Sequence, residues 1–100
     1  MKARISRNAA KVLQKELLHE ENKGLYVRVQ VSHSHGDHAH YSLGLDTPSE
    51  DDVIVDSDHG IQLLLNRLEP LLDGVRIDYF YEPQEGFMVT NPIQGNHGDH

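Results

Sequence analysis

Apolar side chains recur along residues 6–22 with a spacing close to the roughly 3.6 residues of a helical turn. Lys and Glu residues lie between them, so the pattern predicts an amphipathic helix over residues 6–22. Ser6 or Asn8 is suited to accept hydrogen bonds from the first turn, and Gly24 stands where the helix is expected to end. The apolar positions of this helix are Ala9, Ala10, Val12, Leu13, Leu17 and Leu18.

From residue 25 the period changes to two, because apolar and polar residues alternate strictly over residues 25–31. That alternation predicts a strand with one buried face and one exposed face. Its apolar set is Leu25, Val27, Val29 and Val31. Further strands are predicted at residues 41–45, 53–55, 61–65, 75–81 and 87–90.

Segments rich in Gly, Pro and acidic residues separate the predicted strands. We expect an acidic turn at residues 46–52, turns at residues 58–60 and 83–86, and one helical turn starting near Glu69. Residues 32–40 are predicted to form a loop, since Gly and polar residues are poor strand formers. A helix followed by short strands indicates an α+β domain with mostly antiparallel or mixed sheets and one minor helix.

The chain has 100 residues, which suits one small domain; we assign it to residues 1–92, followed by a flexible C-terminal tail over residues 93–100. The formal net charge of −7 argues against nucleic acid as a partner and favours cations or a basic protein. The sequence lacks both the apolar stretch of about 20 residues that a membrane span requires and the apolar run of a signal peptide. We therefore expect a cytoplasmic protein without membrane contact.

Histidine is concentrated in two short segments. Residues 33–40 contain four histidines and one aspartate, and the tetrapeptide His-Gly-Asp-His occurs both there and at the C-terminus. Imidazole and carboxylate groups at such short spacing are typical ligands of zinc, iron, nickel and copper. Because the chain has no cysteine, any metal must be held by nitrogen and oxygen. The candidate metal ligands are His33, His35, Asp37, His38, His40, His97, Asp99 and His100.

The sequence contains no recognisable catalytic machinery. Ser34 beside His35 is too common a juxtaposition to define a nucleophile–base pair, and no glycine-rich phosphate-binding motif occurs. His19 and His59 are interpreted as a helix-surface residue and a turn residue, without a ligand role. We therefore expect a protein that is not an enzyme.

Short pieces spread over almost the whole chain share their order and spacing with one known family. The pieces are residues 5–10, 25–31, 41–46, 60–63, 72–79, 86–87 and 91–92. In these pieces the chain resembles the A-type iron–sulfur carrier family, the HesB/IscA-like proteins. The resemblance implies a HesB-like α+β fold and a non-enzymatic role in iron–sulfur cluster assembly. It also implies a protein partner in that assembly and a homodimer or higher homo-oligomer.

The chain departs from this family at the family's cysteine positions. By the resemblance, the loop cysteine falls on Gly36 and the tail pair falls on Gly98 and His100, so both His-Gly-Asp-His copies lie over cysteine positions. In such proteins the loop and the tail come together, often across a dimer. The resemblance thus implies that the two copies converge on one divalent cation. A conventional Cys-ligated iron–sulfur cluster is not expected, because its thiolate ligands are absent.

Residues 33–38 are also similar to the H-x-H-x-D-H loop of metallo-β-lactamase-type hydrolases, which likewise follows a strand. That resemblance implies one zinc ion held by His33 and His35 and a second held by Asp37 and His38, with zinc-bound water as the nucleophile. The hydrolase fold needs roughly twice the present length. A small zinc-dependent hydrolase therefore stays an alternative, as does a degenerate A-type adaptor or regulator that binds no metal.

Overall fold

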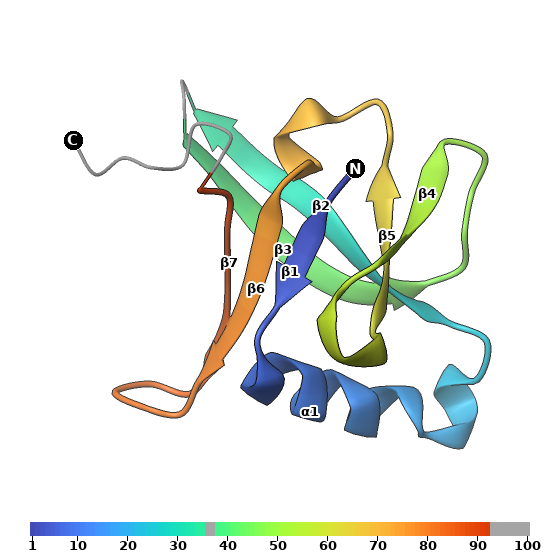
Figure 1. Ribbon diagram of the computed structural model, residues 1–100, viewed down its shortest axis with the longest axis vertical. Helices are drawn as coiled ribbons and strands as arrows, with labels where there is room; N and C mark the ends of the chain where they lie inside the picture. Colours follow the sequence, from blue (N-terminus) through green and yellow to red (C-terminus); the bar gives the residue numbers. More distant parts are fainter. Residues whose placement is uncertain (36–37, 93–100) are drawn as a thin grey trace.

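The computed structural model of this protein describes residues 1–35 and 38–92, and within them seven strands form two mixed sheets beside one α-helix (Figure 1). The three-stranded sheet has the order β1 (Ala3–Ile5), β6 (Val75–Phe80), β7 (Gly86–Thr90). The four-stranded sheet has the order β3 (His38–Asp46), β2 (Tyr26–His35), β5 (Gln62–Asn66), β4 (Asp52–Asp56). The helices are α1 (Arg7–Leu17) and the 3₁₀ turns η1 (Glu20–Asn22), η2 (Asp58–Gly60) and η3 (Pro70–Leu72).

Both sheets combine parallel and antiparallel pairing. β1 runs parallel to β6, and β6 forms an antiparallel hairpin with β7. In the other sheet β2 pairs antiparallel with β3 and parallel with β5, while β4 and β5 are antiparallel. This arrangement confirms the predicted α+β class with mixed sheets.

The helix α1 is shorter than the sequence pattern predicts. Ser6 caps its N-terminus by accepting a hydrogen bond from the backbone N–H of Ala9, as expected. The prediction that the helix reaches residue 22 is wrong, because α1 ends at Leu17 and a separate 3₁₀ turn follows. The side-chain amide of Asn22 donates to the carbonyl of Glu16 at 2.7 Å, which satisfies a backbone acceptor at the end of the helix. Leu18 is one of the apolar positions on which the helix prediction rests, but this residue is 83% exposed.

One hydrophobic core connects α1 with both sheets. Its members follow the periods of the sequence: every third or fourth residue from the helix, and every second residue from β1 and β2. Burial of such aliphatic side chains supplies the main stabilisation, about 1.5–3 kcal/mol for each fully buried one. Core residues include Ile5, Ala9, Leu13, Val27, Val29, Leu63, Leu65, Val75 and Ile77.

Residues 32–40 contradict the prediction of a loop. β2 continues to His35 and β3 begins at His38, so all described residues of this segment belong to the two strands of a hairpin. The polar residues are tolerated because this end of the hairpin exposes Ser32, His33, Ser34 and His40, while Ala39 is buried. The antiparallel pairing of β2 with β3 begins in residues 26–31, where apolar and polar residues alternate. It continues into the polar segment because each further residue pair can add backbone hydrogen bonds between the strands.

The remaining predictions differ little from the structure. β4, β5, β6 and β7 coincide with predicted strands to within one residue at each end. η3 begins at Pro70, and the Glu69 side chain caps it by accepting a hydrogen bond from Leu71 N–H, as expected for a helical turn starting near Glu69. β1 was not predicted, because three residues are too few to show an alternating pattern. The proposed tail over residues 93–100 lies outside the described residues.

Candidate functional site

The β2–β3 hairpin carries the histidine-rich segment at its closed end. The register opposes His33 to His40, and the two imidazole rings lie with centroids 5.9 Å apart and planes inclined by 38°. Both residues are exposed. Nearer the turn, the register opposes His35 to His38. The register therefore sets one histidine position opposite another twice, at residue pairs that are two positions apart along the hairpin.

A bulge in β2 sets His33 opposite His40. Val31 is opposite Tyr41, whereas His33 is opposite His40, so Ser32 is an extra residue in β2. Without it, simple alternation would set His33 against Ala39, a residue that belongs to the buried series of β3. Bulges commonly redirect side chains at functional sites. In this hairpin the bulge moves histidine to the exposed face and leaves Ala39 opposite Ser34.

This end of the hairpin is anchored to η3 by a carbonyl that also accepts from Asn91, the residue after β7. The Tyr41 hydroxyl donates to the carbonyl of Leu71 at 2.9 Å, and the Asn91 side-chain amide donates to the same carbonyl at 2.8 Å. The Asn91 amide also donates to the carbonyl of Asp73 at 2.9 Å, and Asn91 is fully buried. Burial raises the pKa of the Tyr41 phenol, and the carboxylate of Glu69 acts in the same direction. These contacts bring Asn91 close to the hairpin, on the side of the molecule where β7 ends (Figure 1).

The predicted ligands are only partly visible in this arrangement. His33 and His40 are brought together, and His35 and His38 are described by their backbone register alone. Asp37 and the tail residues His97, Asp99 and His100 lie outside the described residues, as do Gly36 and Gly98. In the part of the chain with described side chains, no group of three or more His, Asp and Glu residues is arranged to hold a metal ion.

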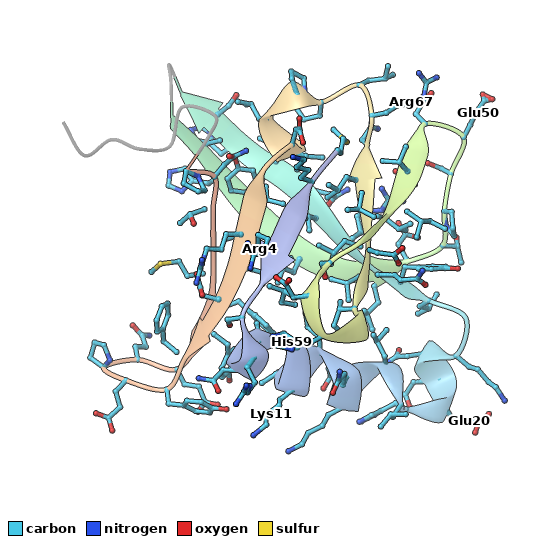
Figure 2. All side chains as sticks on the ribbon, in the orientation of Figure 1. Arg4, Lys11, Glu20, Glu50, His59 and Arg67 are labelled. Atoms are coloured by element: carbon cyan, nitrogen blue, oxygen red, sulfur yellow. The ribbon has the colours of Figure 1, made fainter. Side chains whose placement is uncertain are left out.

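The two histidines that were not predicted as ligands lie elsewhere in the fold. His59 belongs to η2 beside α1 (Figure 2), and its carbonyl accepts a hydrogen bond from the Gln14 side chain at 3.0 Å. His19 is exposed between α1 and η1. Both therefore serve as controls for the histidines of the hairpin.

A second polar cluster lies at the open end of the same hairpin. The Arg28 guanidinium donates to both carboxylate oxygens of Asp52, at 2.8 and 2.6 Å, and to Asp46 at 2.9 Å. The Asp52 carboxylate also accepts bonds from the backbone and hydroxyl of Ser49. Arg28 and these hydrogen bonds hold the pKa of Asp52 well below its usual range, and the carboxylates raise the pKa of Arg28.

The prediction that the acidic turn extends to Asp52 is wrong. Asp52 begins β4, and its side chain is 0% exposed in the ion pair with Arg28. No local pattern marks this pair, because Arg28 lies on the polar face of its predicted strand and 24 positions from Asp52. The cluster closes the loop over residues 47–51 onto the sheet.

The two mixed sheets and the long β2–β3 hairpin define the class of fold found in A-type iron–sulfur carriers. The crystal structure of Escherichia coli SufA, a protein involved in the biosynthesis of iron–sulfur clusters, matches this chain with a TM-score of 0.68. The match covers 92% of this chain and 87% of the SufA chain at 24% sequence identity. The HesB-like fold inferred from the sequence is thereby confirmed.

Sequence comparison adds no closer assignment. No protein-family model matches the chain, and no curated protein matches it. In addition, no helix in the described part of the chain has the length and apolar character needed to cross a bilayer.

Proposed function

We propose that this chain is a non-enzymatic protein of iron–sulfur cluster assembly that binds a divalent metal ion through histidine and aspartate instead of cysteine. The observation that carries the proposal is the facing pair His33 and His40 at the end of the β2–β3 hairpin, within a fold shared with SufA. The extent of that match, over 92% of this chain, favours this class over a metallo-β-lactamase-type hydrolase.

The donor set determines which metal species fits. An iron–sulfur cluster is ordinarily held by Cys thiolates, and none of the 100 residues is cysteine. A thiolate-ligated cluster therefore does not fit this chain. Imidazole suits zinc, copper, nickel and iron ions, and carboxylate oxygen completes such sites. The proposed ligand set is His33, His35, Asp37, His38, His40, His97, Asp99 and His100.

The second half of the ligand set comes from the C-terminal segment. Tyr41 and Asn91 bond to the same carbonyl oxygen, so the chain leaves β7 close to the hairpin. From Pro92 to His97 an extended chain spans up to about 17 Å at roughly 3.4 Å per residue. That length is comparable to the distance along β3 from Tyr41 to the hairpin end, so we propose that His97 reaches the histidines of its own protomer or, in a homodimer, those of the partner.

The proposed role is to hold the ion and pass it to, or receive it from, a protein partner in the cytoplasm. The formal charge of −7 makes a basic protein surface the complementary partner and disfavours nucleic acid. A membrane has no part in the proposal.

Metal titration of protein purified without an affinity tag tests the proposal. Zn²⁺, Fe²⁺, Ni²⁺ and Cu²⁺ are titrated by calorimetry into the wild-type chain and into a variant with His33, His35, His38 and His40 changed to Ala. We expect tight binding by the wild type and a loss of roughly tenfold or more in affinity in the variant. His19→Ala is the control and should bind as the wild type does.

Two results would contradict the proposal. Equal affinity in the wild type and the quadruple variant would exclude these residues as the site. Absence of bound metal on elemental analysis, together with a melting temperature that no metal shifts, would favour the adaptor that binds no metal, because a ligand of the native state must raise its stability.

A further inference from the structure

At the hairpin end, the register of two strands places two imidazole rings next to each other. Resting on the proposed function, we infer that His33 and His40 form a self-sufficient imidazole site, built by the register of β2 and β3, for Cu²⁺, Ni²⁺ or Zn²⁺. The C-terminal segment is not needed for this site to bind. The site thus selects late divalent ions over Fe²⁺.

The distance between the rings suits one shared ion. Two imidazole nitrogens that bind the same ion each lie about 2.0–2.1 Å from it, which places the ring centres roughly 4.5–6.5 Å apart for angles at the metal from about 90° to 180°. The observed separation of 5.9 Å between His33 and His40 falls within that range. Only side-chain rotation is needed to direct one nitrogen of each ring at the ion, because the strands already hold the two residues opposite each other.

The backbone around the pair is fixed before any metal binds. Ala39, next to His40, is buried, and Tyr41 is anchored to the Leu71 carbonyl. On the other strand, the bulge at Ser32 sets His33 against His40. Such preorganisation lowers the entropy lost when two side chains are immobilised by a ligand.

The register supplies a second pair of histidine positions beside the first. His35 and His38 are opposite each other, and positions two apart along a strand belong to the same face of a sheet. Positions 33, 35, 38 and 40 therefore share one face of the hairpin. Two opposed histidine pairs are expected where the pairing of β2 with β3 positions the ligands.

Charge on the surrounding chain favours a cation. Residues 29–66 contain no Lys or Arg, and the acidic residues of this range that form ion pairs are matched by arginines from outside it: Asp46 and Asp52 by Arg28, Asp51 by Arg67, and Asp58 by Arg4. The basic residue that precedes this segment, Arg28, is already neutralised by Asp46 and Asp52. A divalent ion at His33 and His40 consequently meets no cationic side chain of β2 or β3 beyond that ion pair.

The ligand type sets the metal preference. Neutral imidazole nitrogens bind first-row ions with affinities that rise from Mn²⁺ and Fe²⁺ to Ni²⁺ and Cu²⁺, with Zn²⁺ below Cu²⁺. A site whose first ligands are two imidazoles follows this order. Fe²⁺ is therefore expected to bind the hairpin more weakly than Cu²⁺ by at least roughly tenfold.

The test uses three full-length double variants of equal histidine content. His33→Gln/His40→Gln removes the inferred site, His97→Gln/His100→Gln removes the C-terminal histidines, and His19→Gln/His59→Asn is the matched control. Asn is chosen at position 59 because that residue has a φ of 59°, which Asn adopts more readily than Gln. Cu²⁺, Ni²⁺, Zn²⁺ and, without oxygen, Fe²⁺ are titrated by calorimetry, and circular dichroism confirms that each variant is folded.

We expect the hairpin variant to lose roughly tenfold or more in Cu²⁺ affinity, and the other two variants to stay within about threefold of the wild type. In the Cu²⁺ electron paramagnetic resonance spectrum, nitrogen hyperfine structure from imidazole should disappear only in the hairpin variant. Full affinity in the hairpin variant, or loss in the C-terminal variant alone, would overturn the inference while leaving the proposed function intact. Absence of metal binding by the wild type would overturn both.

Discussion

The two ends of the β2–β3 hairpin use the same exposed face in opposite ways. At the open end, Arg28 is closed into an ion pair with Asp52 and Asp46, and its side chain is 12% exposed. At the closed end, His33 and His40 face each other in solvent. The open end satisfies its polar groups within the chain and so contributes to stability. The closed end exposes two imidazole rings to solvent, and these rings are the metal site that we infer.

The largest effect is expected from breaking the open end. Asp52→Ala leaves the Arg28 guanidinium without its buried partner, and we expect a loss of about 2–4 kcal/mol in the free energy of unfolding, measured by urea denaturation. Asp46→Asn is the matched control, because the Asp46 side chain is 55% exposed. It should cost about 0.5–1 kcal/mol. Equal costs for the two changes would contradict the burial of the Asp52 side chain.

Acid should weaken the open end selectively. The folded-state pKa of Asp52 is depressed, so its ion pair stabilises the fold fully above the unfolded-state pKa of about 3.9. As the pH falls below that value toward the lower folded-state pKa, this contribution is lost. The difference in unfolding free energy between the wild type and Asp52→Asn should therefore be constant from pH 7 to about 5 and shrink below about 4. A difference independent of pH down to about 2.5 would exclude Asp52 as its source.

The anchor between the hairpin and β7 should have an intermediate effect. Asn91→Ala removes the hydrogen bonds that its side chain donates to the carbonyls of Leu71 and Asp73, and we expect a loss of about 1–3 kcal/mol in unfolding free energy. Tyr41→Phe removes the hydroxyl that donates to the Leu71 carbonyl, which keeps its bond from Asn91, and should cost about 0.5–1.5 kcal/mol. Chemical denaturation measures both. A greater cost for Tyr41→Phe than for Asn91→Ala would mean that the phenol, and not the buried amide, is the main anchor.

The smallest effect on stability is expected at the closed end. His33→Gln/His40→Gln changes two exposed side chains, so the unfolding free energy without metal should stay within about 0.5 kcal/mol of the wild type. With Cu²⁺ at a free concentration 100 times the wild-type dissociation constant, the wild type should gain about 2.7 kcal/mol, whereas the variant, with roughly tenfold weaker affinity or less, should gain no more than about 1.4 kcal/mol. Thermal unfolding with and without Cu²⁺ measures both. A large cost without metal would mean that the histidines support the fold itself.

The sequence predicts the parts of this molecule that are built by regular patterns. The alternation of Val27, Val29 and Val31 identifies β2, and Ala9 with Leu13 identifies the buried face of α1. The fold class followed from these patterns and from the resemblance to A-type carriers. Short elements without a repeating pattern, such as β1, were missed because their order depends on pairing with a distant strand.

The candidate site was predicted by composition but not by geometry. The density of histidines at residues 33–40 indicated metal chemistry, yet their arrangement depends on the bulge at Ser32, which no local pattern reveals. The same bulge hid the strand, because it breaks the alternation that the preceding residues follow. Asp52 was misplaced for a related reason: its partner Arg28 lies 24 positions away in the chain.

Because of the extra residue at Ser32, the exposed residues at the hairpin end can be changed independently of the buried residues that precede the bulge. Alternation before the bulge specifies the interior, whereas residues beyond it follow a phase of their own. Donor atoms at positions 33 and 40 are therefore exchangeable, thiol or carboxylate for imidazole, without repacking the apolar layer beneath. Replacement of these two surface residues would change the donor atoms of the inferred site and leave the buried side chains in place.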